Sequence, residues 1–283
     1  MEIKARAKIN LTLDVLSKRA DGYHEVEMIM QMVDLYDTIQ LEKAESGITL
    51  STNLPYLPND SGNIAYKAAQ LFFEKTGIMP GVSIHIQKQI PVAAGLAGGS
   101  SNAAAILIAL NELYEASLTT QQLKEMGKTL GADVPYCIVG GTALAQGIGE
   151  RLTILDNAPS MFVLLAKPPI SVSTAWAYGQ VNVDEITVHP DTNRVIQAIE
   201  QGNLKEIANN MYNILEPITA KRHPIIKRIK QIMLDGGALG AMMSGSGPTV
   251  FGLYQNAYDA EQAKDKLALL VKDVFVVSQY ALN

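Results

Sequence analysis

Three glycines and two adjacent serines stand directly before a long apolar run in the segment IPVAAGLAGGSSNAAAILIALNELY. Gly95, Gly98 and Gly99 can adopt positive φ, which lets neighbouring backbone N–H groups converge. Ser100 and Ser101 are predicted to open a buried helix that continues through the apolar run. The unpaired N–H groups and the positive dipole end of a helix start favour an anion such as phosphate. The segment therefore indicates phosphate binding, with a tight strand-to-helix turn as the alternative.

Two common phosphate motifs do not fit this glycine-rich segment. It holds no lysine, so it is not a Walker loop, and Ala97 breaks the Gly-x-Gly-x-x-Gly fingerprint. Mg²⁺ prefers oxygen ligands, and a serine hydroxyl at the start of a helix can supply one. The four histidines are scattered without His-x-x-x-His spacing, so Mg²⁺ is expected to arrive with a phosphate ligand and to contact Ser100, or its neighbour Ser101.

Three further polar residues lie where a side chain could take part in chemistry. Asp133, in GADVPY, follows a predicted helix end, where a carboxylate can accept a proton or simply cap the next turn. Lys8, in AKIN, lies on an alternating strand, and its ordinary orientation is toward solvent. Asn10 shares a face with Lys8 if the strand is regular, and the alternative is an ordinary Asn on an edge strand. The residue types alone leave these alternatives open.

The composition bounds the class of protein. The chain has 283 residues, of which 48% are hydrophobic and 18% charged, enough for one large domain or two ordinary ones. Its net charge of -5 disfavours a nucleic acid or an anionic membrane as the partner. The single cysteine, Cys137, excludes an internal disulfide, and neither a signal peptide nor an apolar run of about 20 residues is visible. We expect a cytoplasmic protein, either a monomer or a homodimer.

The elements that must position these residues follow from hydrophobic periodicity. Alternating or apolar runs predict strands at 7–16, 26–44, 47–53, 81–91, 142–155, 161–168, 237–254 and 274–280, with the glycine-containing segments inside the fifth and seventh of these as turns. Helical spacing predicts helices at 63–75, 100–110, 120–130, 191–201, 203–210, 223–234 and 257–271, the third with a capping box at Thr119 and Gln122.

The mixture of strands and helices predicts the fold class. Both halves of the chain mix the two without strict β-α alternation, which favours an α+β fold. The pattern pauses around 156–159, so we place a domain boundary there and predict domains 1–156 and 157–283.

Three segments in order carry a resemblance to a known family: AKINLTLDVLSKRADGYHEV, PVAAGLAGGSSNAAA and GALGAMMSGSGPTVFGLY. They resemble the three motifs of the GHMP kinases, named for galactokinase, homoserine kinase, mevalonate kinase and phosphomevalonate kinase. One departure is Ala97, where many members carry glycine. The segments RADGYHEV and GADVPYCIVGGTALAQGIGE resemble those members that phosphorylate a cytidine diphosphate-linked sugar alcohol of the non-mevalonate isoprenoid pathway.

The resemblance implies an activity and an architecture. The activity is transfer of the γ-phosphate of ATP to the 2-hydroxyl of 4-(cytidine 5'-diphospho)-2-C-methyl-D-erythritol, with ATP and Mg²⁺ as cofactors. The architecture is an N-terminal ATP-binding α/β domain followed by a ferredoxin-like α+β domain that binds substrate. The implied partners are these two small molecules, with no nucleic acid and no membrane.

The resemblance also implies a role for each candidate residue. Asp133 would take the proton from the attacking hydroxyl, and Lys8 would keep that carboxylate ionised and favour the developing alkoxide. The substrate would be contacted by Asn10, Tyr23, His24, Tyr178, Gly245, Ser246 and Gly247, with Trp176 competing with Tyr178 as a stacking face. ATP would be bound by Pro91, Val92, Ala93, Ala94, Gly95, Leu96, Ala97, Gly98, Gly99, Ser100 and Ser101, and, by analogy of position, by Asn63 and Lys88.

Other functions compete with this one. The nearest is another GHMP kinase, for mevalonate or homoserine, although a cytosine-binding segment has no purpose there. A non-catalytic nucleotide sensor on a kinase scaffold is a second alternative, because folds are reused without their chemistry. Several residues also have structural alternatives: Asn63 as a helix cap, Lys88 as a solvated strand residue, and residues 245–247 as a connection between strands.

Overall fold

The computed structural model describes residues 1–79 and 81–281, which form two compact units. Unit 1 consists of Met1–Ala7, Leu35–Val92 and Ala97–Val139, and unit 2 consists of Lys8–Asp34, Ala93–Leu96 and Gly140–Asn283. Two long strands, β1 (Glu2–Lys18) and β2 (His24–Ala44), contribute residues to both units. The units group residues by contact and not by position along the chain, so the division into domains 1–156 and 157–283 stays a prediction.

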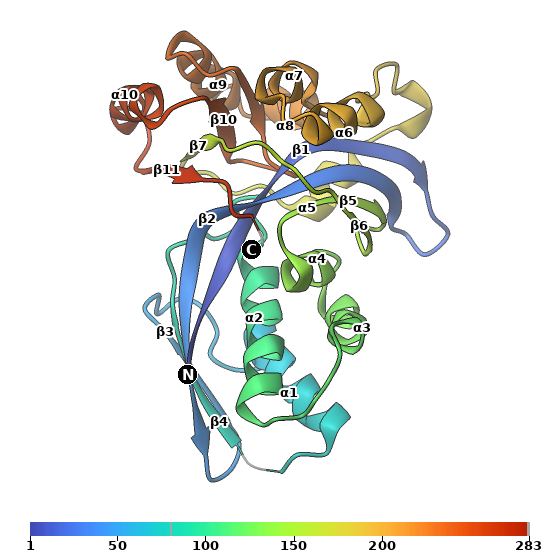
Figure 1. Ribbon diagram of the computed structural model, residues 1–283, viewed down its shortest axis with the longest axis vertical. Helices are drawn as coiled ribbons and strands as arrows, with labels where there is room; N and C mark the ends of the chain where they lie inside the picture. Colours follow the sequence, from blue (N-terminus) through green and yellow to red (C-terminus); the bar gives the residue numbers. More distant parts are fainter. Residues whose placement is uncertain (80, 282–283) are drawn as a thin grey trace. The chain divides into compact units, whose positions relative to one another are not determined.

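Unit 1 is a layer of strands packed against helices (Figure 1). Its strand order is β3-β4-β2-β1, with β3 parallel to β4 and β4 antiparallel to β2. The other elements are β3 (Ile48–Thr52), α1 (Ile64–Thr76), β4 (Gly81–Gln87), α2 (Gly98–Leu113), α3 (Thr120–Leu130) and α4 (Val134–Val139). Helices α1 and α2 pack against each other and share one hydrophobic core with strands β2, β3 and β4. Because α2 is buried along its apolar run, its N-terminus is held in a fixed direction.

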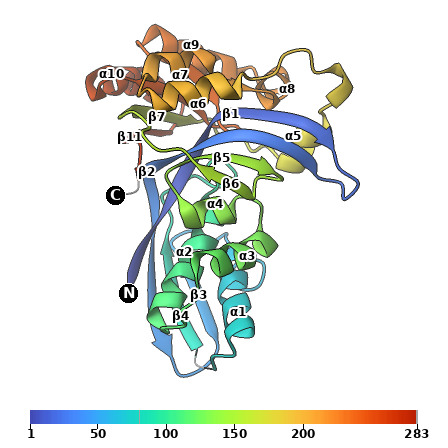
Figure 2. The ribbon, with the colours of Figure 1, turned by 45° about the vertical axis from the view of Figure 1, so that its right-hand side comes forward.

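Unit 2 contains a second sheet, which has four antiparallel strands in the order β11-β7-β10-β9. Two of these strands, β7 and β11, are labelled in Figure 2. These are β7 (Phe162–Lys167), β9 (Gly240–Met243), β10 (Val250–Tyr254) and β11 (Asp273–Ser278), and they contact α9 (Ile225–Asp235) and α10 (Ala257–Ala268). Its other elements are β5 (Thr142–Gly147), β6 (Arg151–Ile154), α5 (Thr174–Gly179), the 3₁₀ helix η1 (Val183–Glu185), α6 (Thr192–Glu200), α7 (Leu204–Asn210), β8 (Tyr212–Asn213) and α8 (Leu215–Arg222).

Strand β1 is buried on both faces from residue 8 to residue 15, within unit 2. Alternation places its apolar residues on one face and its polar residues on the other. The polar face consists of Lys8, Asn10, Thr12 and Asp14, none of which is more than 4% exposed. Buried polar groups need hydrogen-bond partners, so this face of β1 is fixed in position by its contacts.

The predicted elements agree in type with the structure, and the predicted capping box at Thr119 and Gln122 is confirmed. Hydrophobic periodicity did not predict α4, α5, η1, α8 or the two-residue strand β8. These elements have between two and eight residues, too few for periodicity to distinguish a helix or strand from a loop. No described helix is both long and apolar enough to cross a membrane.

Candidate active site

The glycine-rich loop before α2 has the backbone conformation of an anion cradle. Ala93, Gly95 and Ala97 have positive φ angles of 52°, 75° and 55°, and the residues between them do not. Left-handed residues alternating with ordinary ones turn successive N–H groups toward one side, the arrangement that binds anions in other proteins. This conformation is strained for the two alanines, which indicates that the surrounding structure imposes it.

Helix α2 begins at Gly98, two residues before the predicted start at Ser100, so that expectation is corrected. The left-handed Ala97 turns the chain one residue before the helix, and the two glycines that follow form its first turn. Among the described residues no side chain caps this helix, and its first backbone bond runs from Ser101 N to Ala97 O. Gly99 is exposed. The first amides of a helix have no partner within the helix and are the groups that bind anions at a helix start.

A buried polar cluster lies beside the start of α2 and consists of Asp37, Lys88 and Asn102. The ammonium of Lys88 forms an ion pair with Asp37, and their side chains are only 6% and 0% exposed. Lys88 Nζ also donates to Asn102 Oδ1 at 2.9 Å, and Asn102 Nδ2 donates to Asp37 Oδ2 at 2.8 Å. The alternative of a solvated Lys88 is therefore wrong, whereas its predicted approach to ATP stays a prediction. No motif in the sequence marked Asp37 or Asn102 as site residues.

Asp37 also fixes the backbone that leads into the glycine-rich loop. Its Oδ1 atom accepts hydrogen bonds from Gln89 N at 2.7 Å and Ile90 N at 2.9 Å. One carboxylate thus ties β2 to the end of β4 and, through Asn102, to the first turns of α2. This network fixes the position of the first turns of α2.

We expect Asp37→Asn to lower the free energy of unfolding by about 3–5 kcal/mol, because it leaves the Lys88 ammonium buried beside a neutral amide. Urea denaturation monitored by circular dichroism measures this change. Glu42→Gln removes an exposed carboxylate from the same strand and is expected to shift stability by less than about 0.5 kcal/mol. Equal midpoints for the two variants would contradict the assigned role of Asp37.

Asn63 caps helix α1, as its structural alternative predicted. Its Oδ1 accepts from Ala65 N at 3.0 Å, and its Nδ2 donates to Pro58 O at 2.9 Å. Both ends of the amide are thus occupied by backbone groups. Its contact with ATP stays a prediction.

In unit 2, strand β1 carries two of the predicted site residues into a buried position. Lys8 Nζ donates to Asn10 Oδ1 at 2.8 Å, which confirms that the two side chains share a face. Lys8 is 4% exposed, and Asn10 is fully buried on a strand between β2 and β8. The solvent-facing and edge-strand alternatives are therefore wrong. The backbone N–H of Lys8 donates to Leu96 O at 3.2 Å, which joins β1 to the glycine-rich loop.

The second glycine-rich segment connects the antiparallel strands β9 and β10, so the alternative of a connection between strands is confirmed. Gly245 and Gly247 have φ angles of 56° and 87°. Ser244 Oγ donates to Gly95 O at 3.0 Å, and a Cβ placed on Gly245 would lie 3.5 Å from Asn10 Oδ1. The structure thus brings residues 93–96 of the first glycine-rich segment, the second segment and the Lys8–Asn10 face of β1 together within unit 2.

Two polar side chains that the sequence analysis missed hold this second loop. Asn213 Nδ2 donates to Met243 O and Gly245 O, both at 2.8 Å. The hydroxyls of Thr174 and Ser246 lie 3.0 Å apart. No motif marks Asn213 or Thr174, and their role becomes visible only when β8 and α5 are placed.

An aromatic group lies at the turn between β1 and β2. The ring of His24 lies 5.5 Å from the ring of Tyr178, with an angle of 32° between the planes. Tyr23 is 58% exposed. Trp176 instead packs under the guanidinium of Arg222, at 4.6 Å. Burial, and then the charge of Lys18, lower the pKa of His24, so its imidazole is neutral at pH 7 and can both donate and accept a hydrogen bond.

Asp133 directly precedes α4 and is half-buried. Its backbone carbonyl accepts a hydrogen bond from Cys137 N at 3.0 Å. Burial, with smaller effects of Cys137 and Asp133, raises the pKa of Tyr136 well above its usual value, so this phenol stays neutral. Asp133 belongs to unit 1 and Lys8 to unit 2, and their joint action stays a prediction.

Comparison with known proteins identifies the class. The description "GHMP kinases N terminal domain" matches residues 63–141, and "GHMP kinases C terminal" matches residues 195–272. The chain belongs to the GHMP kinase family, a small-molecule kinase family with an α+β fold, as its three motifs predicted.

Individual members of the family differ in how similar they are to this chain. A relative from Alkaliphilus metalliredigens, named 4-diphosphocytidyl-2-C-methyl-D-erythritol kinase, is 52% identical over 282 residues, which cover 99% of this chain and 97% of the relative. A crystal structure of 4-(cytidine 5'-diphospho)-2C-methyl-D-erythritol kinase matches with a TM-score of 0.86 and 34% identity, over 100% of both chains. A homoserine kinase structure from Cytophaga hutchinsonii, 21% identical, matches with a TM-score of 0.77 over 99% of this chain and 95% of that chain, and shares the fold.

Proposed function

We propose that the chain transfers the γ-phosphate of ATP to the 2-hydroxyl of 4-(cytidine 5'-diphospho)-2-C-methyl-D-erythritol, giving ADP and the 2-phosphate. The proposal rests above all on the 52% identity, over 99% of the chain, to a relative named for this reaction. The Tyr23, His24 and Tyr178 group adds support, because two aromatic rings and a neutral imidazole suit a planar base. The reaction belongs to the non-mevalonate pathway of isoprenoid precursors.

The chemistry can be assigned to residues of this chain. The amides of Gly98, Gly99 and Ser100 hold the phosphate chain of ATP at the positive end of α2. Asp133 accepts the proton of the attacking hydroxyl, and Lys8 stabilises the alkoxide as it forms. Phosphoryl transfer depends mostly on positioning and charge, so the chain needs no covalent nucleophile.

Mg²⁺ fits this arrangement as a partner of ATP. No group of three or more His, Cys, Asp or Glu side chains that could hold a metal occurs among the described residues. Ser100 is half-buried in the first turn of α2. Its hydroxyl is the kind of single oxygen ligand that Mg²⁺ takes from a protein when phosphates supply the others. When bound there, Mg²⁺ would neutralise charge on the phosphates.

A competition between acceptors tests the proposed function. ADP release is measured with the cytidine-linked alcohol, mevalonate and homoserine at equal concentrations. We expect turnover only with the cytidine-linked alcohol. Preference for an acceptor without cytidine would favour another GHMP kinase activity, and ATP binding without turnover of any acceptor would favour the sensor.

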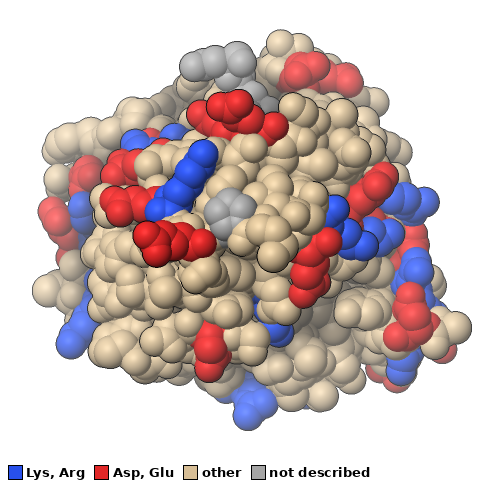
Figure 3. Space-filling view, turned by 90° about the horizontal axis from the view of Figure 1, so that it is seen from below, with Lys and Arg blue, Asp and Glu red and all other residues tan. Residues whose placement is uncertain are grey.

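The proposed partners are these small molecules alone, with the chain acting in the cytoplasm as a monomer or a homodimer. Figure 3 shows one face of the molecule, on which acidic and basic side chains are interspersed. The net charge of -5 also disfavours nucleic acid as a partner. Binding of nucleic acid depends on a gathered basic surface, which this face does not present among its described residues.

A further inference from the structure

The turn between β1 and β2 presents the aromatic residues Tyr23 and His24, and its backbone is closed by three hydrogen bonds. Arg19 N donates to Tyr23 O at 2.9 Å, and Gly22 N donates to Arg19 O at 3.2 Å. Tyr23 N donates to the side chain of Asp21, at 3.1 Å to Oδ1. Residues 19–23 are all exposed, so polar contacts and not apolar burial hold the conformation of this turn.

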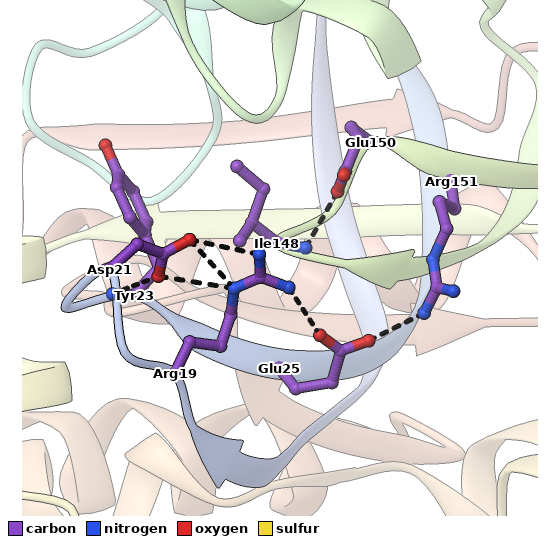
Figure 4. A network of polar contacts seen from close by, with 7 residues as sticks. All are labelled: Arg19, Asp21, Tyr23, Glu25, Ile148, Glu150 and Arg151. Carbon is purple, nitrogen blue, oxygen red and sulfur yellow. Dashed lines mark hydrogen bonds and ion pairs between the residues drawn. The ribbon is translucent and has the colours of Figure 1, made fainter.

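Arg19 joins the two ends of this turn through its side chain (Figure 4). Its Nη2 atom lies 3.0 Å from Asp21 Oδ2 and its Nε atom 3.1 Å from the same oxygen, which is a forked contact. Its Nη1 atom donates to Glu25 Oε2 at 2.9 Å. One guanidinium thus binds a carboxylate on each side of Tyr23 and His24.

The network of ion pairs extends from Glu25 to another hairpin of unit 2. Glu25 Oε1 accepts from Arg151 Nη2 at 2.6 Å, and Arg151 is the first residue of β6 (Figure 4). Each oxygen of Glu25 therefore binds a different guanidinium. Next along β2, Glu27 accepts from Gln146 Nε2 at 2.9 Å, across the pairing of β2 with β5. The turn is thereby tied to the β5–β6 hairpin.

We propose that Arg19 is a positioning residue that sets the affinity for the cytidine end of the substrate by fixing the turn that carries Tyr23 and His24. This inference rests on the proposed function. Arg19 does not need to touch the base, because it acts through the backbone that presents the two side chains. The proposed function assigns ATP binding to the start of α2, so the KM for ATP is expected to report on residues other than this turn.

The ion pairs of this network are solvent-exposed, which limits how much each one stabilises the turn. The side chains of Arg19, Asp21, Glu25 and Arg151 are 40%, 49%, 25% and 64% exposed. A single exposed ion pair contributes little, whereas forked and linked pairs contribute more. The hydrogen bond from Arg19, and then that from Tyr23 N, lower the pKa of Asp21. Asp21 is therefore ionised at neutral pH and loses its charge only as the pH falls below its ordinary acidic range.

Arg19→Gln tests the proposal, because it keeps a polar side chain but loses the charge and the fork. We expect the KM for the cytidine-linked alcohol to rise about tenfold, with kcat and the KM for ATP within about twofold of wild type. Arg19→Lys keeps the positive charge but not the forked contact, so its KM for the alcohol should lie between those of wild type and Arg19→Gln. Added salt should raise the wild-type KM for the alcohol more than that of Arg19→Gln, because ions screen the exposed pairs.

Arg194→Gln is the matched control, since Arg194 forms an exposed ion pair with Glu206 on other elements of unit 2. It should leave both KM values unchanged. Equal rises in both KM values, or no rise, for Arg19→Gln would overturn the proposal.

Amide hydrogen exchange on the free protein measures how firmly the turn is held, independently of the reaction. The amides of Gly22 and Tyr23 should exchange faster in Arg19→Gln than in wild type or Arg194→Gln. Unchanged exchange would refute the positioning role, whatever the kinetics. If wild type fails to turn over the cytidine-linked alcohol, the proposed function fails, and the exchange result still decides whether Arg19 fixes the turn.

Discussion

Asp133→Asn is expected to lower kcat by about 10²- to 10⁴-fold while leaving the affinity for ATP nearly unchanged. The amide has almost the shape of the carboxylate, but it cannot accept the proton of the attacking hydroxyl. Asp133 lies directly before α4 and is half-buried, so the isosteric change leaves the packing of the neighbouring Val134 and Pro135 intact. Kinetics of ADP release measure kcat, and calorimetric titration with ATP measures binding.

The control for this variant is Asp265→Asn, which neutralises an exposed aspartate on α10. It should match wild type in turnover, in ATP affinity and in its unfolding midpoint. Wild-type turnover in Asp133→Asn would remove Asp133 from the proton transfer. A matching loss of ATP affinity would assign Asp133 to nucleotide binding instead.

Hydrophobic periodicity predicted the elements that carry the site, because those elements are long and buried. The period of two along β1 placed Lys8 and Asn10 on one face, and their side chains do meet. The apolar run after Ser101 predicted α2, since a buried helix needs apolar residues all round. Both features depend on the pattern of residues within one element, so they can be predicted from the sequence alone.

The sequence pattern did not predict which groups the buried polar side chains would bind. Leu35, Ile39 and Leu41 are buried at alternate positions of β2, and Asp37 shares their face. The alternation alone therefore indicates that Asp37 is buried and needs a partner. It does not indicate Lys88 or Asn102, which lie 51 and 65 residues away, because that choice depends on how β2, β4 and α2 pack.

The glycine-rich loop shows the same division between local and tertiary information. Its composition predicted positive φ angles, and Gly95 has one. The motifs also grouped the two glycine-rich segments through a family resemblance. Only the structure shows that Ser244 and Gly95 are hydrogen-bonded and that Asn213 holds the strand end beside them.

Gly95→Ala is expected to lower the free energy of unfolding by about 2–5 kcal/mol and to raise the KM for ATP at least about tenfold. Two effects add at this position. Gly95 has a φ of 75°, which is strained for alanine. A Cβ there would also lie 2.3 Å from Ser244 O, a backbone atom that cannot move without displacing the second loop. The loop must therefore shift, and the amides at the start of α2 shift with it.

Gly77→Ala separates the two effects, because Gly77 ends helix α1 with a φ of 70° and nothing within 4 Å of the added Cβ. It carries the same conformational strain without the clash, so it should cost about 1 kcal/mol and leave the KM for ATP unchanged. Urea denaturation and steady-state kinetics on both variants measure the difference. If the two variants lost equal stability and kept wild-type kinetics, the contact of Gly95 with Ser244 would have no part in forming the phosphate site.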